Sequence, residues 1–175
     1  LEGDVNRLEA FAKRGVRYLG LLHFSSNDAG FPAYGRGRRD DEGLTRFGRE
    51  LVAKCESLGV IVDLSHINKR GFLDDDQLRA VADAGGCVGV MFCPKFLGGD
   101  GLGPVVKHLQ HIVDVCGEDA PALGSDWDGF IVPSAGLADP TGLPALTGAM
   151  LEAGMSEQTI GKILRDNVLR VLHDT

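Results

Sequence analysis

Short apolar runs alternate with helical stripes along most of this chain, and this alternation restricts the folds that it can adopt more than any other feature. The runs Val16–Leu22, Gly59–Leu64, Cys87–Phe92 and Pro121–Gly124 contain few of the polar positions that would expose one face of a strand. Strands that are apolar on both faces are typical of a parallel sheet covered by helices. The sequence therefore predicts an α/β fold built from βα units.

Helices are predicted between these strands. Apolar residues recur at helical spacing, as at Leu51, Cys55 and Leu58, and Ser156 is a natural N-cap for the last helix. The long segment 25–41 is rich in Gly, Ser, Asn and Arg and is predicted to be a loop. The predicted helices cover residues 4–14, 45–58, 74–84, 104–116, 143–153 and 157–172.

Composition limits the function classes. The 175 residues suit one domain, and the formal net charge of -7 argues against a nucleic acid as the main partner. No apolar run is long enough to span a membrane, and no signal peptide is visible at the start. The four cysteines are scattered without a CxxC pair and are expected to be free thiols. We therefore expect a single domain over residues 1–175 in a reducing, cytoplasmic compartment.

Polar side chains follow three of the predicted strands. His23 ends the first apolar run, Ser65 and His66 follow the second, and Asp126 and Asp128 follow the last. The carboxyl ends of parallel strands meet at one edge of the sheet, where ligands bind in such folds. We therefore predict that the side chains of His23, His66 and Asp126 open into one pocket.

Several of these polar residues also have structural interpretations. His66 could cap a strand end, and the segment "GSDWDG" could form an Asx-rich turn. Asp63 could support a neighbouring ligand or form a salt bridge in the helical layer. His108 and His111 have a spacing that can suit a metal, but a solvated helix face is the preferred interpretation.

Asn167 is predicted to be buried. It lies seven residues after Ile160, so it shares the apolar face of the last helix with Ile163, Leu164 and Val171. A buried amide without partners is costly. We therefore expect Asn167 to hydrogen-bond backbone groups of a neighbouring loop and to hold the last helix in place.

Four strings give the chain a family resemblance. "GVRYLGLLHFSSN", "GLTRFGRELVAKCESLGVIVDLSH", "LGSDWDG" and "RDNVLRVL" resemble, in this order, the membrane (renal) dipeptidase family of zinc peptidases. The resemblance runs from about Asp4 to the end of the chain. It implies a (β/α)8 TIM-type barrel related to the amidohydrolases, and the hydrolysis of small dipeptides.

The resemblance also implies roles for three residues. His66 corresponds to a zinc ligand, and His23 to the histidine that contacts the substrate and helps to polarise the scissile carbonyl. Asp126 corresponds to the aspartate that binds the substrate amine and is proposed to carry the proton. Two zinc ions would activate a bridging hydroxide in the complete enzyme. The resemblance also allows a homodimer.

The chain also lacks several features of the family pattern. The H-x-D zinc pair of the first barrel strand has no counterpart here, and Glu2 is not in the position of the bridging glutamate. One internal βα unit of roughly 30 residues, with a second zinc histidine and a carboxylate-binding arginine, is also absent near Phe72 and Leu73. We therefore expect an incompletely represented barrel, a spatial gap between Phe72 and Leu73, and weak binding of zinc by this chain.

Two other functions are alternatives. A related amidohydrolase acting on another small amide or lactam would share His66 and Asp126 but differ in the 25–41 loop. A non-catalytic barrel remnant is the other alternative, because the chain shows a single credible zinc ligand.

Overall fold

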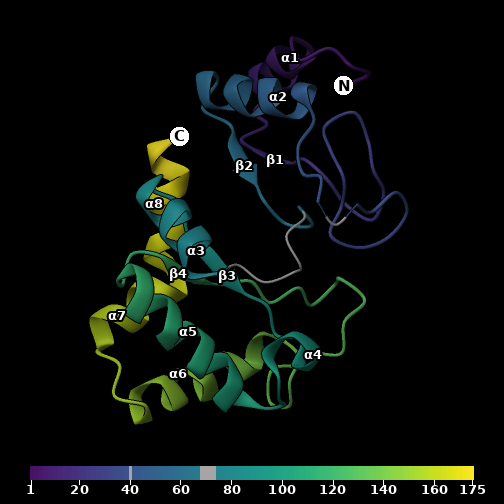
Figure 1. The fold of residues 1–175 in the computed structure, drawn as a ribbon. Coiled ribbons are helices and arrows are strands. Elements are labelled where there is room, and N and C mark those ends of the chain that lie inside the picture. The colour runs from purple at the N-terminus through teal and green to yellow at the C-terminus, as the bar shows by residue number, and fades with distance from the viewer. Residues whose placement is uncertain (40, 68–73) are drawn as a thin grey trace. The chain divides into compact units, whose positions relative to one another are not determined.

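The computed structural model describes residues 1–39, 41–67 and 74–175, which form a mixed α/β protein (Figure 1). The described residues form two compact units. Unit 1 comprises Leu1–Leu73 with Leu172–Thr175, and unit 2 comprises Asp74–Val171. The single domain over residues 1–175 stays a prediction.

Unit 1 contains a pair of parallel strands whose register can be read directly. Tyr18 pairs with Ile61 and Gly20 with Asp63, so the two strands end together. Each strand is preceded by a helix, as the sequence predicts, although both strands are shorter than their apolar runs. The elements are α1 (Arg7–Lys13), β1 (Tyr18–Gly20), α2 (Arg46–Ser57) and β2 (Ile61–Asp63).

Helix α2 shows how local sequence sets the limits of an element. The Thr45 side chain accepts a hydrogen bond from the Gly48 amide and so caps the helix N-terminus. Leu51 and Cys55 lie one turn apart and face the core of unit 1. The buried core of this unit is formed by Leu8, Ala12, Leu21, Leu22, Ala29, Leu51, Cys55 and Val60.

Unit 2 contains the second parallel pair, in which Val88 pairs with Pro121 and Val90 with Leu123. Helix α3 begins with a reciprocal capping box between Asp74 and Gln77, which explains its sharp start. The elements are α3 (Asp75–Asp83), β3 (Val88–Val90), α4 (Pro94–Leu97), α5 (Leu102–Cys116), β4 (Pro121–Leu123), η1 (Pro140–Gly142), α6 (Leu143–Glu152), α7 (Glu157–Gly161), η2 (Lys162–Asp166) and the first part of α8 (Asn167–Asp174), whose residues from Leu172 on belong to unit 1.

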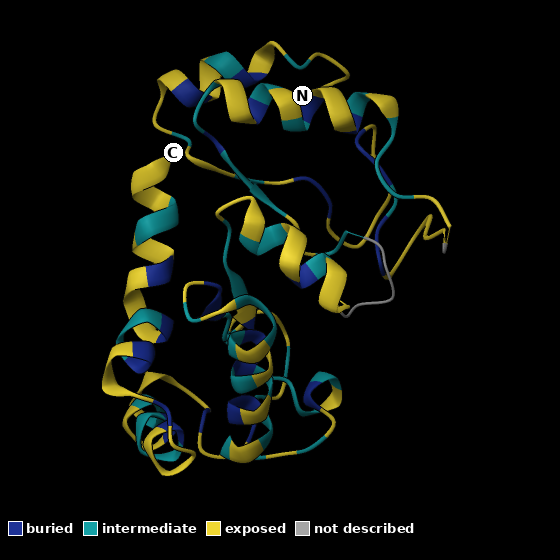
Figure 2. Cartoon of the chain, turned by 60° about the vertical axis from the view of Figure 1, so that its left-hand side comes forward, coloured by how far each residue is buried: buried dark blue, intermediate teal, exposed yellow. Residues whose placement is uncertain are grey.

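The core of unit 2 gathers around helix α5. Val105 and Leu109 are fully buried on its inner face, and Phe92 and Met150 from other elements pack in the same cluster. Figure 2 shows the resulting banding, with buried residues on one side of the long helices and exposed residues on the other. The predicted amphipathic helices are therefore confirmed in this unit.

The predicted final helix is interrupted by a π turn. Residues 157–172 form α7, the π-helical segment η2 and α8 in succession, and Ser156 caps the start by accepting a hydrogen bond from the Thr159 amide. Hydrogen bonds in a π turn join residues five apart. Lys162 and Asn167 have this spacing, and both contact the turn that precedes β4.

The structure confirms the prediction that Asn167 is buried and hydrogen-bonded to backbone groups of a neighbouring loop. It is buried, and its Nδ2 donates hydrogen bonds of 2.9 Å to the Glu118 carbonyl and 2.8 Å to the Pro121 carbonyl. Lys162 Nζ contacts the Glu118 carboxylate at 2.7 Å, and Arg170 donates to the Asp119 carbonyl at 3.0 Å. The last helix therefore holds the start of β4 through three side chains.

Parallel pairing of the strands is confirmed, whereas the described residues do not show a closed barrel. Two short helical elements were not predicted, namely α4 and η1, each with a proline in its first turn. None of the helices in residues 1–39, 41–67 and 74–175 is long and apolar enough to cross a bilayer.

Candidate functional site

His23 and His66 lie together at the strand ends of unit 1. Because the register pairs Gly20 with Asp63, each histidine lies three residues beyond the last paired position of its strand. Their ring centroids are 4.6 Å apart, and the planes meet edge to face at 78°. The two rings are therefore neighbours, and the predicted pocket that they share with Asp126 stays a prediction.

Phe24 completes a three-ring cluster with the two histidines. Its ring centroid lies 4.2 Å from that of His23 and 5.1 Å from that of His66, although the side chain is 52% exposed. Sequence reasoning did not predict this residue, and its position directly after His23 is the only local signal. We call His23, Phe24 and His66 the ring cluster.

The turn after β2 is built by the sequence "DLSH". Asp63 Oδ1 accepts a hydrogen bond of 2.8 Å from the Ser65 amide, so this carboxylate shapes an Asx turn. His66 follows with a φ of 64°, a left-handed conformation that is uncommon for residues with a Cβ. Strained backbone of this kind occurs often at functional sites.

The 25–41 loop is tied to both strand ends. The Ala33 amide donates to the His66 carbonyl at 2.8 Å, and the Arg36 amide donates to the Phe24 carbonyl at 2.9 Å. The Ser26 amide in turn donates to the Arg36 carbonyl at 2.9 Å. Residues 26–36 of the predicted loop are therefore hydrogen-bonded to the backbone next to the ring cluster.

Asp126 lies in unit 2, at the carboxyl end of β4. Its φ is 59°, and its carbonyl accepts a hydrogen bond of 3.0 Å from the Gly129 amide, which closes a tight turn. Trp127 anchors that turn, since its Nε1 donates to the Leu137 carbonyl at 2.7 Å and its ring packs against Phe92. The "GSDWDG" segment is thus a turn that exposes a carboxylate, and its meeting with His23 and His66 stays a prediction.

The described residues do not build a complete metal site. Among residues 1–39, 41–67 and 74–175, no group of three or more His, Cys, Asp or Glu side chains is arranged to hold a metal. His108 Nε2 contacts the Leu97 carbonyl at 3.2 Å and His111 Nε2 contacts Asp75 Oδ1 at 2.9 Å, so these two histidines have separate partners. Two imidazoles of the ring cluster are fewer than the three or four protein ligands that zinc usually takes.

The cysteines do not extend the site. Cys55, Cys87, Cys93 and Cys116 are free, as predicted. Burial raises the pKa of the thiols of Cys55, Cys87 and Cys116, which disfavours the reactive thiolate.

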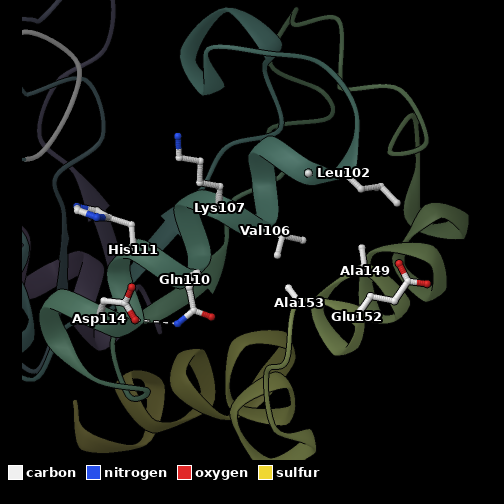
Figure 3. Close-up of a pocket in the computed structure, with 10 residues that line it drawn as sticks. Leu102, Val106, Lys107, Gln110, His111, Asp114, Ala149, Glu152 and Ala153 are labelled. Atoms are coloured by element: carbon white, nitrogen blue, oxygen red, sulfur yellow. Dashed lines mark hydrogen bonds between the residues drawn. The ribbon is translucent and has the colours of Figure 1, made fainter.

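Unit 2 contains a groove between α5 and α6 (Figure 3). Gln110 Nε2 donates to Asp114 Oδ1 at 2.8 Å along one wall, and Ala149 and Ala153 form the other. None of the predicted site residues lines this groove, which lies between helices and not at strand ends. It therefore does not compete with the ring cluster as the candidate site.

Comparison with known proteins decides the family. The profile of the membrane dipeptidase family, peptidase family M19, matches residues 1–74 and 68–175. The chain belongs to this family. The predicted family and its enzyme class, metallo-dipeptidase, are therefore confirmed.

Three relatives show how far the similarity extends. A Klebsiella pneumoniae protein encoded in the pqqA 5′ region is 33% identical over 208 residues, covering 98% of this chain and 76% of the relative. An uncharacterised dipeptidase of Schizosaccharomyces pombe is 31% identical over 207 residues, covering all of this chain and 50% of the relative. A Rhodobacter sphaeroides metallo peptidase, solved with a phosphinate mimic of the dipeptide L-Ala-D-Ala, is 33% identical with a TM-score of 0.79, covering 98% of this chain and 59% of that one.

These alignments also concern the internal βα unit that the sequence comparison with the family predicts to be absent from this chain. Both sequence alignments are longer than the 175 residues of this chain, so they contain positions at which this chain has no residue. The two segments matched by the family profile overlap at residues 68–74. This agrees with the expected absence of an internal unit near residue 72, whereas the predicted gap between Phe72 and Leu73 lies outside the described residues.

Proposed function

We propose that this M19 chain contributes His23, His66 and Asp126 to the active site of a zinc-dependent dipeptidase. The observation that carries the proposal is the edge contact between the His23 and His66 rings, 4.6 Å apart at the ends of two paired parallel strands. The dipeptide mimic bound to the Rhodobacter sphaeroides relative supports a dipeptide as the substrate.

Each of the three residues has a role that its chemistry allows. His66 would offer a neutral imidazole nitrogen to a metal ion, which is the commonest protein ligand of zinc. His23, with an exposed ring beside it, would donate a hydrogen bond to the scissile carbonyl oxygen. Asp126, an exposed carboxylate, would bind the substrate amine and carry a proton.

Zinc itself fits the described residues only in part. Two ions are expected in the complete enzyme, yet the described side chains provide too few ligands for either. Residues 1–175 expressed alone should bind zinc weakly in equilibrium dialysis, and a tightly held stoichiometric ion would contradict the assignment of His66 as its single ligand.

A (β/α)8 barrel is the proposed architecture of the complete protein. Two-stranded sheets are marginal on their own, and both β1·β2 and β3·β4 leave strand edges that further parallel strands could pair. A barrel also brings all carboxyl strand ends to one face, which would join Asp126 to the ring cluster.

Two further proposals concern the location and the oligomeric state of the protein. The four free cysteines support a reducing, cytoplasmic location. A homodimer stays a prediction from the family resemblance.

Substitutions in the intact, zinc-loaded protein test the proposed roles. His66→Ala should release zinc and abolish hydrolysis of L-Ala-D-Ala, because a metal ligand is lost. Asp126→Asn should keep the metal but lower turnover by about 100-fold or more, since proton transfer typically contributes that much. His111→Ala, which removes a surface histidine paired with Asp75, should change neither zinc content nor rate.

Other outcomes separate the alternatives. Zinc binding without dipeptide hydrolysis, together with turnover of another small amide or lactam, would favour the related amidohydrolase. Neither zinc nor turnover in the intact protein would favour the non-catalytic remnant. Full activity of His66→Ala would overturn the proposal.

A further inference from the structure

The carboxylate of Asp126 lies directly against the backbone of Gly129. The Asp126 carbonyl accepts a hydrogen bond of 3.0 Å from the Gly129 amide, so these two residues are the ends of one tight turn. A Cβ at position 129 would overlap three atoms of the Asp126 side chain, namely Cγ, Oδ1 and Oδ2. The carboxylate therefore occupies the space that a side chain at position 129 would fill.

Gly129 is not required by its own backbone conformation. Gly136 has a φ of 85°, whereas the φ of Gly129 lies outside the left-handed region, so an alanine could adopt the same backbone. The three heavy atoms nearest to a Cβ at position 129 all belong to the Asp126 side chain, and none of them to the backbone. The group that needs a glycine at this position is thus the Asp126 carboxylate.

Rotation of the Asp126 carboxylate about its own bond cannot relieve this overlap. Cγ lies on the axis of χ2, so turning the two oxygens leaves the contact with Cγ unchanged. The side chain would have to change its χ1 rotamer, which moves all three atoms. Since non-bonded heavy atoms pack at about 3.5–4.0 Å, the displacement would be on the order of 1 Å or more.

The backbone of the turn is anchored more firmly than the carboxylate. Trp127, between Asp126 and Gly129, donates to the Leu137 carbonyl at 2.7 Å, and its ring packs against the buried Phe92 with centroids 5.8 Å apart. The exposed Asp126 carboxylate makes no hydrogen bond or ion pair with the part of the chain that the structure describes. A side chain at position 129 would therefore displace the carboxylate and not the turn.

We propose that Gly129 is a positioning residue, which keeps free the space from which the Asp126 carboxylate acts on the substrate. This role rests on the proposed function, in which Asp126 binds the substrate amine and carries a proton. A group that transfers a proton must lie within hydrogen-bond reach of it. A misplacement of about 1 Å can lower the rate about 100-fold, so the absence of a side chain at position 129 sets the turnover rate.

The test replaces glycines of unit 2 by alanine in the intact, zinc-loaded protein. Gly129→Ala should lower kcat for L-Ala-D-Ala by about 100-fold and keep the zinc content and the melting temperature, because the displaced group is an exposed side chain. Gly148→Ala, where a Cβ would meet open space, should keep the turnover and zinc content of the wild type. Gly142→Ala, whose Cβ would overlap the Gly136 carbonyl oxygen, should lower melting temperature and turnover together.

A double-mutant cycle separates positioning from a general effect on the fold. Residues that act through one another are coupled, whereas independent residues have additive effects. Gly129→Ala should therefore lower kcat of the wild type but change that of Asp126→Asn by no more than about twofold. Equal factors in the two backgrounds, a fall in melting temperature like that of Gly142→Ala, or an unchanged rate in Gly129→Ala would overturn the proposal.

Crystal structures of the wild type and of Gly129→Ala distinguish failure of this role from failure of the proposed function. The Asp126 carboxylate should lie against Gly129 in the wild type and take another χ1 rotamer in the variant, whether or not dipeptides are hydrolysed. This change in a protein without turnover would contradict the dipeptidase proposal and support the positioning of the carboxylate. An Asp126 side chain that keeps its rotamer in Gly129→Ala would overturn the role of Gly129.

Discussion

Each unit contains one pair of parallel three-residue strands, but the two pairs differ in how deeply they are buried. In unit 2 the strands lie in the core, with Val90 and Ala122 buried. In unit 1 none of the residues of β1 and β2 is buried, and Tyr18 is 58% exposed. The three-residue strands and the parallel pairing are the same, so the difference comes from what covers them.

The covered strand pair of unit 2 contrasts with the more exposed strand pair of unit 1. Unit 2 provides a dense core and a last helix whose side chains hold the start of β4. Unit 1 provides two histidines and a neighbouring phenylalanine just beyond its strand ends. Binding residues must stay accessible, so they are often found on loops and strand ends that a packed scaffold positions.

The largest expected effect is a core truncation in unit 2. Leu109→Ala removes a fully buried side chain from α5 and should cost about 2–5 kcal/mol of the free energy of unfolding. Urea unfolding followed by the fluorescence of Trp127, the single tryptophan, measures this unit. Leu151→Ala, at a position 47% exposed on α6, is the matched control, and an equal loss there would contradict the assignment of the core.

A smaller loss is expected where the last helix meets β4. Asn167→Leu removes the donor to the Glu118 and Pro121 carbonyls and should cost about 1–3 kcal/mol, because these groups lose their partner. The melting temperature should fall while metal content and turnover of the intact enzyme are kept. Val168→Leu, at a half-exposed position one residue on, is the control, and lost turnover at an unchanged melting temperature would place Asn167 in the active site.

In unit 1 the corresponding weak point is the glycine before Arg36. Gly35→Ala places a Cβ in a left-handed residue against the Phe24 carbonyl and should cost about 1–3 kcal/mol of local stability. Amide hydrogen exchange at Arg36 and Ser26 should speed up, because their pairing is broken. Gly43→Ala, where a Cβ would meet open space, should leave both exchange rates unchanged, and an unchanged Gly35→Ala loop would contradict the described backbone.

The smallest effect is expected from pH in unit 2. Hydrogen bonds from Lys162 and then Thr159 lower the pKa of Glu118 below its usual 4.5. A lowered folded pKa gives stability that is present above pH 4.5 and is lost as the pH falls through the folded pKa. Thermal melts at decreasing pH should therefore show a steeper fall of the melting temperature in the wild type than in Glu118→Gln. Glu152→Gln, at an exposed position on α6, should follow the wild type, and identical curves for Glu118→Gln would contradict this coupling.

At alkaline pH the same contact makes stability fall as the pH rises, which is the opposite of its effect at acidic pH. Hydrogen bonds to Asp119 and then Glu118 raise the pKa of Lys162 above its usual 10.5. The stability that the charged Lys162 contributes is fully present below pH 10.5 and is lost as the pH rises through the pKa of Lys162 in the folded protein. In thermal melts, Lys162→Met should remove the alkaline dependence and weaken the acidic one, because Thr159 still donates a hydrogen bond to Glu118.

The sequence by itself determined the order of the elements, the helix caps and the polar strand ends. Thr45, Asp74 and Ser156 cap helices through bonds to residues three positions away, so their effect is local. The burial of Asn167 also followed from periodicity, because side chains on one helix face share one environment.

Only the tertiary structure decided the rest. The π turn, the approach of Phe24 to the two histidines and the backbone pairing of Arg36 with Phe24 depend on the register of β1 with β2 and on backbone hydrogen bonds across a loop. Such pairings join residues far apart in the sequence, and local propensity carries no information about them. The sequence could therefore place His23 and His66 at strand ends, but only the fold brought their rings to 4.6 Å from each other.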